Sequence, residues 1–326
     1  MILMFLSILV FCAYLIFYKI SSIKSESVRC LLGKTAIVTG GNSGVGFGTA
    51  ILLASRGCKV IIADCVNGEK SRDEIIRKTH NPNIFYKFLD LASLRSVRQF
   101  CEDIKKSEKK IDILINNAGI GASAKTKTED GLNYVMQVNY FGGFLLTHLL
   151  LEPLKAAEAA KVIFVGSITT IKNNLTTENL NLIDCTTDDV YIEKCYANSK
   201  FCNILAAQGF GKKLKKYGIT ANSLDPVAVK TKIFREAFEF YNFKPFKWFT
   251  QVTIFILGLD KMIAAEMYLN LAINEKLDNE TGKHYFGWST VPSIIKLTIE
   301  KDEHFCDEIW KKTEMLVDLK VEEKLK

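Results

Sequence analysis

The sequence predicts one α/β domain, built on a doubly wound parallel sheet and preceded by an N-terminal transmembrane helix. Short β-branched runs alternate with longer amphipathic segments across residues 34–120, which is the pattern of βαβ units. A glycine-rich turn follows the first run, and residues 1–18 carry no charged side chain. The expected boundaries are an anchor at 1–20, a linker at 21–30 and the domain at 31–326.

The composition is that of a folded protein. The chain has 326 residues, of which 48% are hydrophobic and 24% charged, so it can bury a full core, and a disordered or low-complexity protein is excluded. The net charge of +7 is spread along the chain, which argues against a nucleic-acid partner. The nine cysteines form no Cys-x-x-Cys pair. We therefore expect a reducing compartment, without a disulfide framework or a zinc site.

Residues 1–18 form the predicted anchor. As a helix they span about 27 Å, the thickness of a thin bilayer such as that of the endoplasmic reticulum. Basic residues begin at Lys19 and Lys24, so the positive-inside rule places the domain in the cytosol. No basic region precedes the apolar run and no small-x-small cleavage site follows it, which disfavours a cleaved signal peptide and a secreted enzyme. Sugar on the Asn174 or Asn279 sequon would reverse that interpretation.

Six apolar runs are predicted to be strands, buried on both faces of the parallel sheet. They cover residues 35–39, 59–63, 84–89, 111–115, 162–165 and 219–224. Between them, apolar residues recur at three- and four-residue spacing, which predicts crossover helices. The clearest of these segments are residues 44–56, 93–106 and 132–151. The sequence contains no internal repeat or second folding unit, so we expect a single domain after the anchor.

The turn after the first predicted strand can bind a dinucleotide. It reads Thr39-Gly40-Gly41-Asn42-Ser43-Gly44-Val45-Gly46 and opens the following helix. Glycines at such a turn allow a tight bend, close approach of the backbone to a pyrophosphate and tight packing of the helix on the strand. A glycine turn with a purely structural role is the alternative. The position between a buried strand and a helix favours a cofactor.

Asp64 ends the second predicted strand, at the place, about 20 residues past the glycine turn, where an acidic side chain bonds the adenosine ribose and repels a 2′-phosphate. No Arg or Lys follows it immediately, and Ser43 rather than a basic residue precedes Gly44. NAD is therefore the favoured cofactor, with NADP as the alternative. A third interpretation is that Asp64 only begins a turn.

Tyr196 and Lys200 lie at i and i+4 of a stretch with helical periodicity. They share one helix face, where an ammonium favours phenolate and lowers the tyrosine pKa from about 10. A phenol tuned in this way can give or take a proton. One exposed ion pair cannot bring the pKa to neutrality, but a water-poor site beside a positively charged nicotinamide ring can. Taken alone, Tyr-x-x-x-Lys is common on helix surfaces.

Other polar residues are expected at the same edge of the sheet. Ser167 follows the fifth strand, where its hydroxyl can polarise a substrate oxygen. Asn139 can hold a water or a helix carbonyl in a proton relay to the lysine, and Asn116-Asn117-Ala118-Gly119 follows the fourth strand. Singly, each is better explained by turn chemistry or helix capping. Together and in this order they favour an active site.

With these motifs the chain resembles the short-chain dehydrogenase/reductase family, and within it the membrane-anchored retinol dehydrogenase-like members. The resemblance implies a Rossmann-type fold and a catalytic tetrad of Asn139, Ser167, Tyr196 and Lys200. It implies that Tyr196 is the general acid/base, that Ser167 positions the substrate oxygen, and that Lys200 binds the nicotinamide ribose. It also implies that Asp90 contacts the adenine. The complete set of expected cofactor-binding residues is Thr39, Gly40, Asn42, Ser43, Gly44, Val45, Gly46, Asp64, Asp90, Leu91, Asn117, Ala118, Gly119, Tyr196, Lys200, Pro226, Val229 and Thr231.

Two positions depart from the family pattern. After the sixth strand the relatives usually have His-Pro-Gly, where this chain has Asp225-Pro226-Val227. Valine is not expected to reach the conformations open to glycine, which leaves the path of this loop beside the nicotinamide undetermined. Many anchored relatives carry an Arg after the second strand and prefer NADP, where this chain has Asp64-Cys65. The expectation of NAD therefore rests on this sequence.

Two segments are candidates for the substrate site. Residues 169–189 form a polar insertion between Ser167 and Tyr196 and are expected to make one wall of the pocket. Residues 234–257 are rich in aromatic and aliphatic side chains and suit a lipophilic entrance facing the bilayer. Ordinary core or a homodimer interface is the alternative. The uncharged stretch at 248–259 is too short to cross a membrane.

The sequence thus predicts a membrane-anchored, cytosol-facing oxidoreductase of the endoplasmic reticulum, which interconverts a hydrophobic alcohol and its aldehyde or ketone. A retinoid is the expected substrate, and a sterol or fatty aldehyde is the alternative. A further alternative is a non-catalytic membrane or lipid-droplet scaffold that uses the dinucleotide fold. The intact tetrad argues against a scaffold, and the unusual loop at Asp225 leaves it open.

Overall fold

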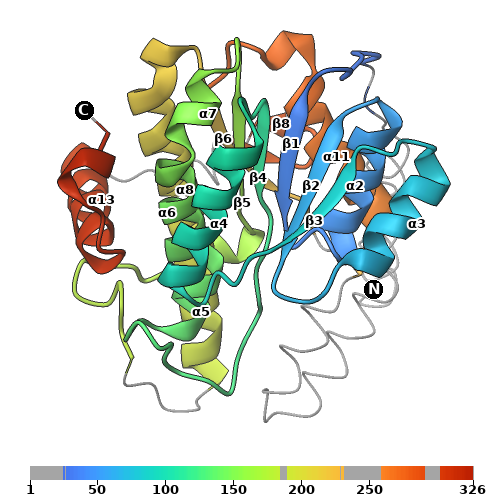
Figure 1. Ribbon diagram of the computed structural model, residues 1–326. Coiled ribbons are helices and arrows are strands. Elements are labelled where there is room, and N and C mark those ends of the chain that lie inside the picture. Colours follow the sequence, from blue (N-terminus) through green and yellow to red (C-terminus); the bar gives the residue numbers. More distant parts are fainter. Residues whose placement is uncertain are drawn as a thin grey trace, which may run out of the picture.

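The described residues form one sheet with helices on both faces (Figure 1). The computed structural model describes Ser25 and residues 27–183, 189–227, 229–230, 258–290 and 302–325. The strands are β1 (Thr35–Thr39), β2 (Lys59–Asp64), β3 (Ile84–Phe88), β4 (Ile113–Asn116), β5 (Lys161–Val165), β6 (Thr220–Asp225), β7 (His284–Phe286) and β8 (Ser289–Thr290). Their order in space is β3-β2-β1-β4-β5-β6-β7-β8, with β8 alone antiparallel to its neighbour. The predicted α/β domain with a parallel sheet is confirmed.

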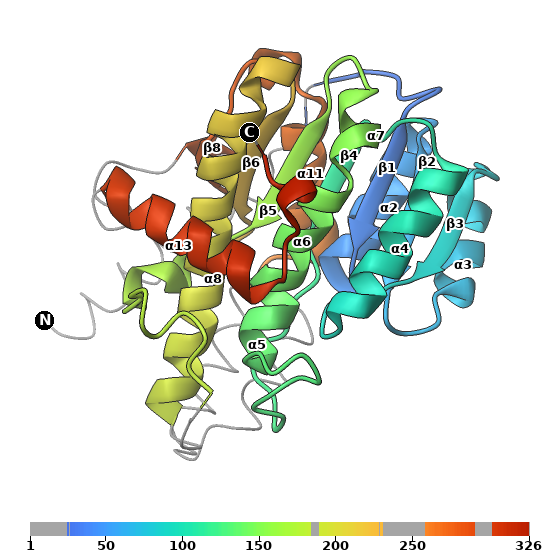
Figure 2. The same cartoon turned by 60° about the vertical axis from the view of Figure 1, so that its left-hand side comes forward.

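Two helical layers enclose the sheet, as Figures 1 and 2 show. On one face lie α4 (Leu94–Ser107), α6 (Gly142–Leu149) and α8 (Asp189–Leu214), with α13 (Glu303–Leu316) packed on α8. On the other face lie α2 (Gly44–Ser55), α3 (Glu69–Thr79) and α11 (Lys261–Ile273). Short elements complete the described chain: α5 (Tyr134–Met136), α7 (Leu151–Lys155), the π-helical η1 (Gln137–Phe141), and the 3-10 turns η2 (Ile168–Lys172), η3 (Lys215–Tyr217), η4 (Glu275–Leu277) and η5 (Val321–Glu323).

The strand order positions the site. It reverses between β1 and β4, and ligands of open α/β sheets bind at such a switch point, outside the carboxyl ends of the strands. We call the edge at which the parallel strands end the carboxyl edge, and the opposite one the amino edge. Side chains alternate along each strand between two apolar clusters, one under each helical layer. A polar side chain at the end of a strand therefore belongs to one layer or the other.

The helix predicted at 132–151 is not continuous. α5 passes into the π-helical turn η1 before α6 begins, and α7 follows after Leu150. A π turn inserts one extra residue and is frequent at functional sites. Apolar spacing of three and four residues continues through such an insertion, so the sequence pattern did not reveal it. Asn139 lies inside this turn.

The expectation that all strands are buried on both faces is wrong for β3. This strand is at the edge of the sheet, and the side chains of Phe85 and Phe88 are 42% and 58% exposed. An edge strand has a neighbour on one side only, so the helical layers cover it less completely. Its apolar sequence alone does not distinguish an edge strand from a central one.

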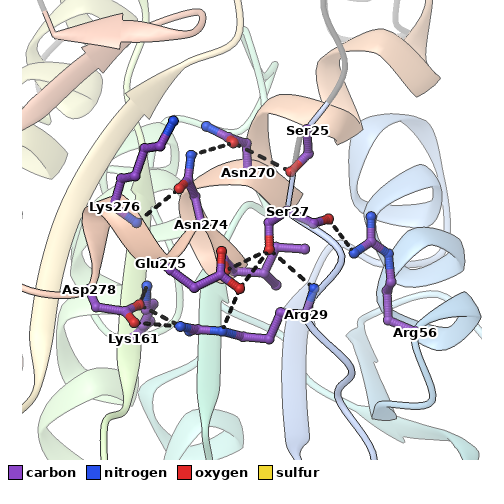
Figure 3. Close-up of polar contacts among 11 residues, drawn as sticks. Ser25, Ser27, Arg29, Arg56, Lys161, Asn270, Asn274, Glu275, Lys276 and Asp278 are labelled. Atoms are coloured by element: carbon purple, nitrogen blue, oxygen red, sulfur yellow. Dashed lines mark hydrogen bonds and ion pairs between the residues drawn. The ribbon is translucent and has the colours of Figure 1, made fainter.

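Residues assigned to the linker are docked on the amino edge (Figure 3). Arg29 makes two hydrogen bonds to Asp278, at 3.0 and 2.5 Å. Asp278 also accepts one at 2.6 Å from Lys161, at the start of β5. Ser27 is buried and donates to the carbonyl of Ile273 at 3.2 Å. Ser25 donates to Asn270 at 3.4 Å, so the packed part of the chain reaches back to Ser25.

In the part of the chain that the structure describes, no helix combines the length and the apolar character needed to span a membrane. The predicted anchor at 1–20 and the apolar segment at 234–257 lie outside the described residues.

Candidate active site

The glycine turn between β1 and α2 has the geometry of a phosphate-binding loop. Gly40 and Gly44 have φ angles of +63° and +58°, in the left-handed region that favours glycine. A Cβ on Gly46 would lie 2.4 Å from the carbonyl oxygen of Gly40, so α2 can approach the turn this closely only with glycine there. Ser43 precedes α2 without a side-chain capping bond, and the first turn of α2 carries no acidic residue. This cradle fits a pyrophosphate at the helix N-terminus.

Thr39 joins the glycine turn to the turn that follows β4. Its Oγ1 accepts hydrogen bonds from the N–H groups of Asn117 and Ala118, at 2.9 and 3.0 Å. The Asn117 Nδ2 donates in return to the Thr39 carbonyl at 2.8 Å. Two segments that were predicted separately to bind a cofactor are therefore held side by side at the carboxyl edge.

Asp64 lies at the end of β2 and is tied to the glycine turn. Its Oδ2 accepts a hydrogen bond from the N–H of Asn42 at 3.2 Å, and its Oδ1 accepts one from the N–H of Val66 at 3.0 Å. The bond from Val66 is typical of an aspartate that begins a turn. The bond from Asn42 connects Asp64 to the predicted phosphate loop. Burial, followed by the charges of Asp64 and Asp90, raises the pKa of the Cys65 thiol. Both carboxylates thus lie around this end of the site.

Tyr196 and Lys200 lie one turn apart on α8, at the end of β5. The Lys200 side chain is buried, and its Nζ donates to the carbonyl of Val165 at 3.3 Å. The same Nζ lies 5.7 Å from the centroid of the Tyr196 ring, and the Ser167 side chain lies close enough to the phenol to lower its pKa. Ser167 also accepts hydrogen bonds from the backbone N–H and the hydroxyl of Thr169, at 3.3 and 3.0 Å. Three members of the predicted tetrad are brought together here.

The pKa values at this site are set mainly by burial. Burial lowers the pKa of Lys200 to about 8, and the charge of Asp225 opposes this. Burial raises the pKa of Tyr196 above its usual range, the Ser167 hydrogen bond lowers it, and Asp225 raises it. For these side chains alone the pKa of Tyr196 is raised, because desolvation of the phenol dominates, so the lowering by Lys200 stays a prediction. A phenolate here needs a further positive charge close to it.

Asn139 holds the loop that follows Gly119. Its Oδ1 accepts from the N–H of Ile120 at 2.8 Å, and its Nδ2 donates to the Ile120 carbonyl and to Ser199 Oγ, both at 2.9 Å. A Cβ on Gly119 would lie 3.1 Å from Lys200 Nζ and 3.2 Å from Asn139 Oδ1, so glycine allows the loop, the amide and the ammonium to meet. The relay role of Asn139 stays a prediction, because its amide bonds the loop and Ser199 rather than the lysine.

Asn203 is a further residue of this site, which was not among the predicted ones. This buried residue follows Lys200 by three positions on α8, and its Nδ2 donates to the carbonyls of Asn139 and Val165, both at 3.0 Å. It ties the π-helical turn to the end of β5 and shares the Val165 carbonyl with Lys200. The i+3 spacing from Lys200 is a signal that could have found it, since such residues share a helix face.

The turn after β6 corrects a further expectation. Val227 has a φ angle of +66°, so valine does take a left-handed conformation of the kind that favours glycine. The Asp225 Oδ1 accepts a hydrogen bond from the N–H of Val227 at 2.7 Å, and the Asp225 carbonyl accepts one from Gly287 at 2.9 Å. A β-branched residue in this region costs about 1–3 kcal/mol. The bonds of Asp225 hold the turn in place against that strain.

The remaining predicted cofactor residues have mixed positions. Val45 and Leu91 are buried in the apolar clusters. Pro226 lies within the turn after β6, and the buried Val229 pairs with Leu259 through an isolated β-bridge. Thr231 lies outside the described residues.

Part of the insertion at 169–189 packs beside α8. A cavity of about 60 Å³ lies there. Its lining residues are Met136, Asn174, Asn179, Leu182, Lys194, Cys195 and Asn198. Asn174, Asn179 and Leu182 come from the insertion. Sites for drug-sized ligands are several times larger, so the role of the insertion as a wall of the substrate pocket stays a prediction.

Comparison with known proteins leads to one family. A family model described as short chain dehydrogenase matches residues 34–178. Retinol dehydrogenase 13 of Mus musculus is 34% identical over 296 residues, which cover 88% of this chain and 84% of that protein. A solved structure of an uncharacterized protein from Mycobacterium Paratuberculosis has a TM-score of 0.67 at 23% identity, covering 91% of this chain and 97% of that one. A short chain dehydrogenase from Escherichia coli, complexed with NADPH, has a TM-score of 0.60 at 19% identity, covering 80% and 99%.

The two structural likenesses show the fold, and the similarity to the retinol dehydrogenase over most of both chains shows the family. The fold of this family binds an NAD(P) dinucleotide. The chain therefore belongs to the short chain dehydrogenase family, as its motifs predicted, and it is an NAD(P)-dependent oxidoreductase that acts on CH–OH groups.

Proposed function

We propose that this oxidoreductase interconverts retinol-like lipophilic alcohols and their carbonyl compounds, with Tyr196 as the general acid/base. One observation carries this proposal: the Ser167 hydroxyl, the Tyr196 phenol and the Lys200 ammonium lie together at the end of β5. The glycine turn that fits a pyrophosphate follows β1, and only β4 lies between β1 and β5 in the sheet. A dinucleotide bound at the turn could extend along the carboxyl edge to these groups.

Each residue has a distinct task in this scheme. Tyr196 takes the proton from the substrate hydroxyl in oxidation and returns one in reduction. The Ser167 hydroxyl positions the substrate oxygen, and Lys200 holds the nicotinamide ribose. The nicotinamide, when bound, supplies the hydride chemistry. Asn139 and Asn203 keep the loop and the strand end around Lys200 in place.

The substrate class follows from the relatives. The curated relatives in this comparison carry the name retinol dehydrogenase, with 30–37% identity to this chain. A small lipophilic alcohol is therefore the proposed substrate, and a retinoid is the first to test. Steroids and long-chain aldehydes are further members of the same chemical class.

NAD is the proposed cofactor, with NADP as the alternative. The Asp64 carboxylate is held at the end of β2 by two backbone N–H groups, those of Asn42 and Val66. A 2′-phosphate placed beside a fixed carboxylate meets a like charge, whereas a ribose hydroxyl can donate a hydrogen bond to it. The bond to Asn42 places this carboxylate beside the phosphate loop and supports the preference.

We further propose that residues 1–20 anchor the enzyme in the endoplasmic reticulum membrane with the domain in the cytosol, and that the enzyme forms a homodimer. The Asn174 sequon tests the cytosolic placement. Its Oδ1 and backbone N–H are hydrogen-bonded to Asn198, at 3.1 and 3.0 Å, and neither bond uses the Nδ2 that would carry a sugar. Sugar on Asn174 would therefore contradict the proposed cytosolic placement.

The test uses the full chain in detergent micelles. Titration with NADH and NADPH, followed by the fluorescence of the reduced nicotinamide, should give NADH the higher affinity by about tenfold. Asp64→Asn should reduce that preference. Asp73→Asn removes an exposed carboxylate of α3 and should leave the preference unchanged. Retinoids, steroids and long-chain aldehydes are then tested for turnover.

The outcomes separate the parts of the proposal. Tighter binding of NADPH to the wild type would reject the NAD preference and leave the acid/base scheme standing. Normal cofactor binding without turnover of any alcohol or carbonyl compound would reject the catalytic proposal and favour a binding-only scaffold.

A further inference from the structure

Asp225 is a buried carboxylate at the carboxyl edge, where many relatives have histidine. Along β6, Ala221 belongs to the apolar cluster under α8, and Leu224 belongs to the cluster under α11. Side chains alternate along a strand, so Asp225 shares the face of Ala221 and points to the layer of α8. The residue is 1% exposed.

The two oxygens of Asp225 have different surroundings. Oδ1 accepts the hydrogen bond from the N–H of Val227 at 2.7 Å and so closes the turn. Oδ2 is buried and has no hydrogen-bond partner among the described residues. Leaving a carboxylate oxygen buried and unpaired is costly. A turn needs only the first oxygen, so the second calls for another explanation.

The Lys200 ammonium offers an explanation for the unpaired Oδ2. Its Nζ contacts the carbonyl of Val165, and Val165 is paired in register with Leu224, the residue before Asp225. Neighbouring strands lie about 4.8 Å apart, so the ammonium lies at the strand end beside Asp225, in the same layer. The charge of Asp225 raises the pKa of Lys200, against the larger effect of burial.

We propose that Asp225 is a positioning residue of the active site, whose carboxylate keeps the buried Lys200 ammonium charged and directed to the cofactor. This proposal rests on the proposed function, in which Lys200 holds the nicotinamide ribose. The balancing charge comes from the Asp225-Pro226-Val227 loop, the segment that departs from the His-Pro-Gly pattern. The same side chain closes the strained turn and supplies the counter-charge.

Other titratable groups around Asp225 do not supply that charge. Tyr196 on α8 and Tyr268 on α11 have pKa values raised by burial and then by the charge of Asp225, so both stay neutral. His284 on β7 bonds the Ser223 hydroxyl at 2.9 Å, and burial lowers its pKa to about 4. At neutral pH, Lys200 is therefore the charged partner of Asp225 in the described part of the site.

Asp225→Asn tests the charge without removing the turn, because the amide oxygen can still accept from the Val227 N–H. We assign the alkaline limb of the pH profile of kcat/KM to the loss of the Lys200 proton, because burial lowers the pKa of Lys200 to about 8 and raises that of Tyr196. We expect this limb to move down by about one pH unit in the variant. Asp112→Asn is the matched control. It removes a buried carboxylate at the amino edge, where Asp112 pairs with Lys34 at 3.0 Å, and it should leave the limb in place.

A second readout does not depend on activity. Asp225→Asn, Lys200→Met and the double variant form a cycle in urea unfolding. At pH 7.5 the loss of stability in the double variant should be smaller than the sum of the single losses, because each single change leaves one buried charge unpaired. Burial raises the pKa of Asp225 to about 7, against the Val227 hydrogen bond and the charge of Lys200. The carboxyl is then neutral at pH 5, and the coupling should disappear there.

The two readouts distinguish the failures. Absence of turnover with an intact coupling in the cycle would reject the proposed function but keep the charge pair. An unmoved alkaline limb together with additive losses would overturn the proposal and leave Asp225 as a cap of the turn. If Asp225→Asn does not fold, the same comparison is made in a Val227→Gly background, where glycine takes the positive φ without strain.

Discussion

At the amino edge of the sheet, acidic and basic side chains form direct ion pairs. At the carboxyl edge, the buried Asp225 carboxylate and the buried Lys200 ammonium lie near each other without such a pair. Asp278 receives hydrogen bonds from Arg29 and Lys161, and Glu108 receives two from Lys59 at 2.7 and 2.8 Å. Among the described residues, the Asp225 Oδ2 has no such donor.

The difference is visible in the pKa values of the two carboxyls. Burial opposes ionisation of Asp278, but the hydrogen bonds from Arg29 and Lys161 outweigh it and lower its pKa. Burial raises the pKa of Asp225 to about 7 because its weaker opponents, the Val227 N–H and the Lys200 charge, do not offset it. The ion pairs of the amino edge thus stabilise the fold. At the carboxyl edge, Asp225 and Lys200 have pKa values of about 7 and about 8, close to neutral pH, as is common at functional sites.

The largest expected effect is on the activity of the carboxyl edge. Tyr196→Phe removes the phenolic hydroxyl with little change of shape, so turnover should fall by about 10²–10⁴-fold while the affinity for NADH is retained. Steady-state kinetics and cofactor fluorescence measure the two quantities. Tyr217→Phe makes the same chemical change at a partly exposed residue after α8 and should have no effect. Full turnover by the Tyr196 variant would contradict the separation of roles between the edges.

The next effect is on the stability of the amino edge. Asp278→Asn removes the charge that pairs Arg29 and the buried Lys161, so the free energy of unfolding at pH 7 should fall by about 1–2 kcal/mol, less than for a fully buried pair because Asp278 is partly exposed. Turnover per folded molecule should not change. The folded-state pKa of Asp278 is lowered, so this contribution is present above the unfolded pKa and is lost as pH falls through the folded value.

Urea unfolding at pH 7 and at acid pH measures both expectations for Asp278. Glu74→Gln is the control, because it removes a carboxylate from an exposed pair with Lys78 and should leave the free energy of unfolding unchanged. A selective loss of turnover in the Asp278 variant would show that the amino edge also serves the reaction.

The smallest effect concerns the backbone. Val227→Gly relieves the positive φ at the carboxyl edge but makes the unfolded chain more flexible, so the free energy of unfolding should rise by about 0–1 kcal/mol. Gly33→Val is the opposite change at the amino edge, where φ is +75° and no atom lies within 4 Å of an added Cβ. It should lower the free energy of unfolding by about 1–2 kcal/mol. A destabilised Val227→Gly variant would mean that the valine side chain contributes more than its strain costs.

Most of the sheet could be predicted from the sequence. The six apolar runs correspond to β1 through β6 with shifts of one or two residues at their ends, because buried parallel strands have a strong signature. The helix α3 was harder to predict, because Ile75 is its one buried residue and a mostly polar helix has little hydrophobic periodicity. β7 and β8 have three and two residues, too few for a pattern.

The site was predictable where residue type determines chemistry. Ser167, Tyr196 and Lys200 follow from their motifs and their places at strand ends, and the structure brings them together. The π-helical turn, the double role of Asn203 and the positive φ of Val227 depend on tertiary contacts. The i+3 spacing from Lys200 could point to Asn203 as a neighbour, but no local sequence pattern encodes the contacts that these three features make.

The Thr39 hydroxyl connects the two segments that form the adenine and nicotinamide halves of the proposed cofactor site. It accepts hydrogen bonds from Asn117 and Ala118, so we expect a fragment such as AMP that binds the glycine turn to restrain also residues 117–119, which lie beside Lys200. We expect a second fragment then to cost less conformational entropy on binding. By reciprocity, each fragment raises the affinity for the other by the same factor, and the intact dinucleotide gains from both.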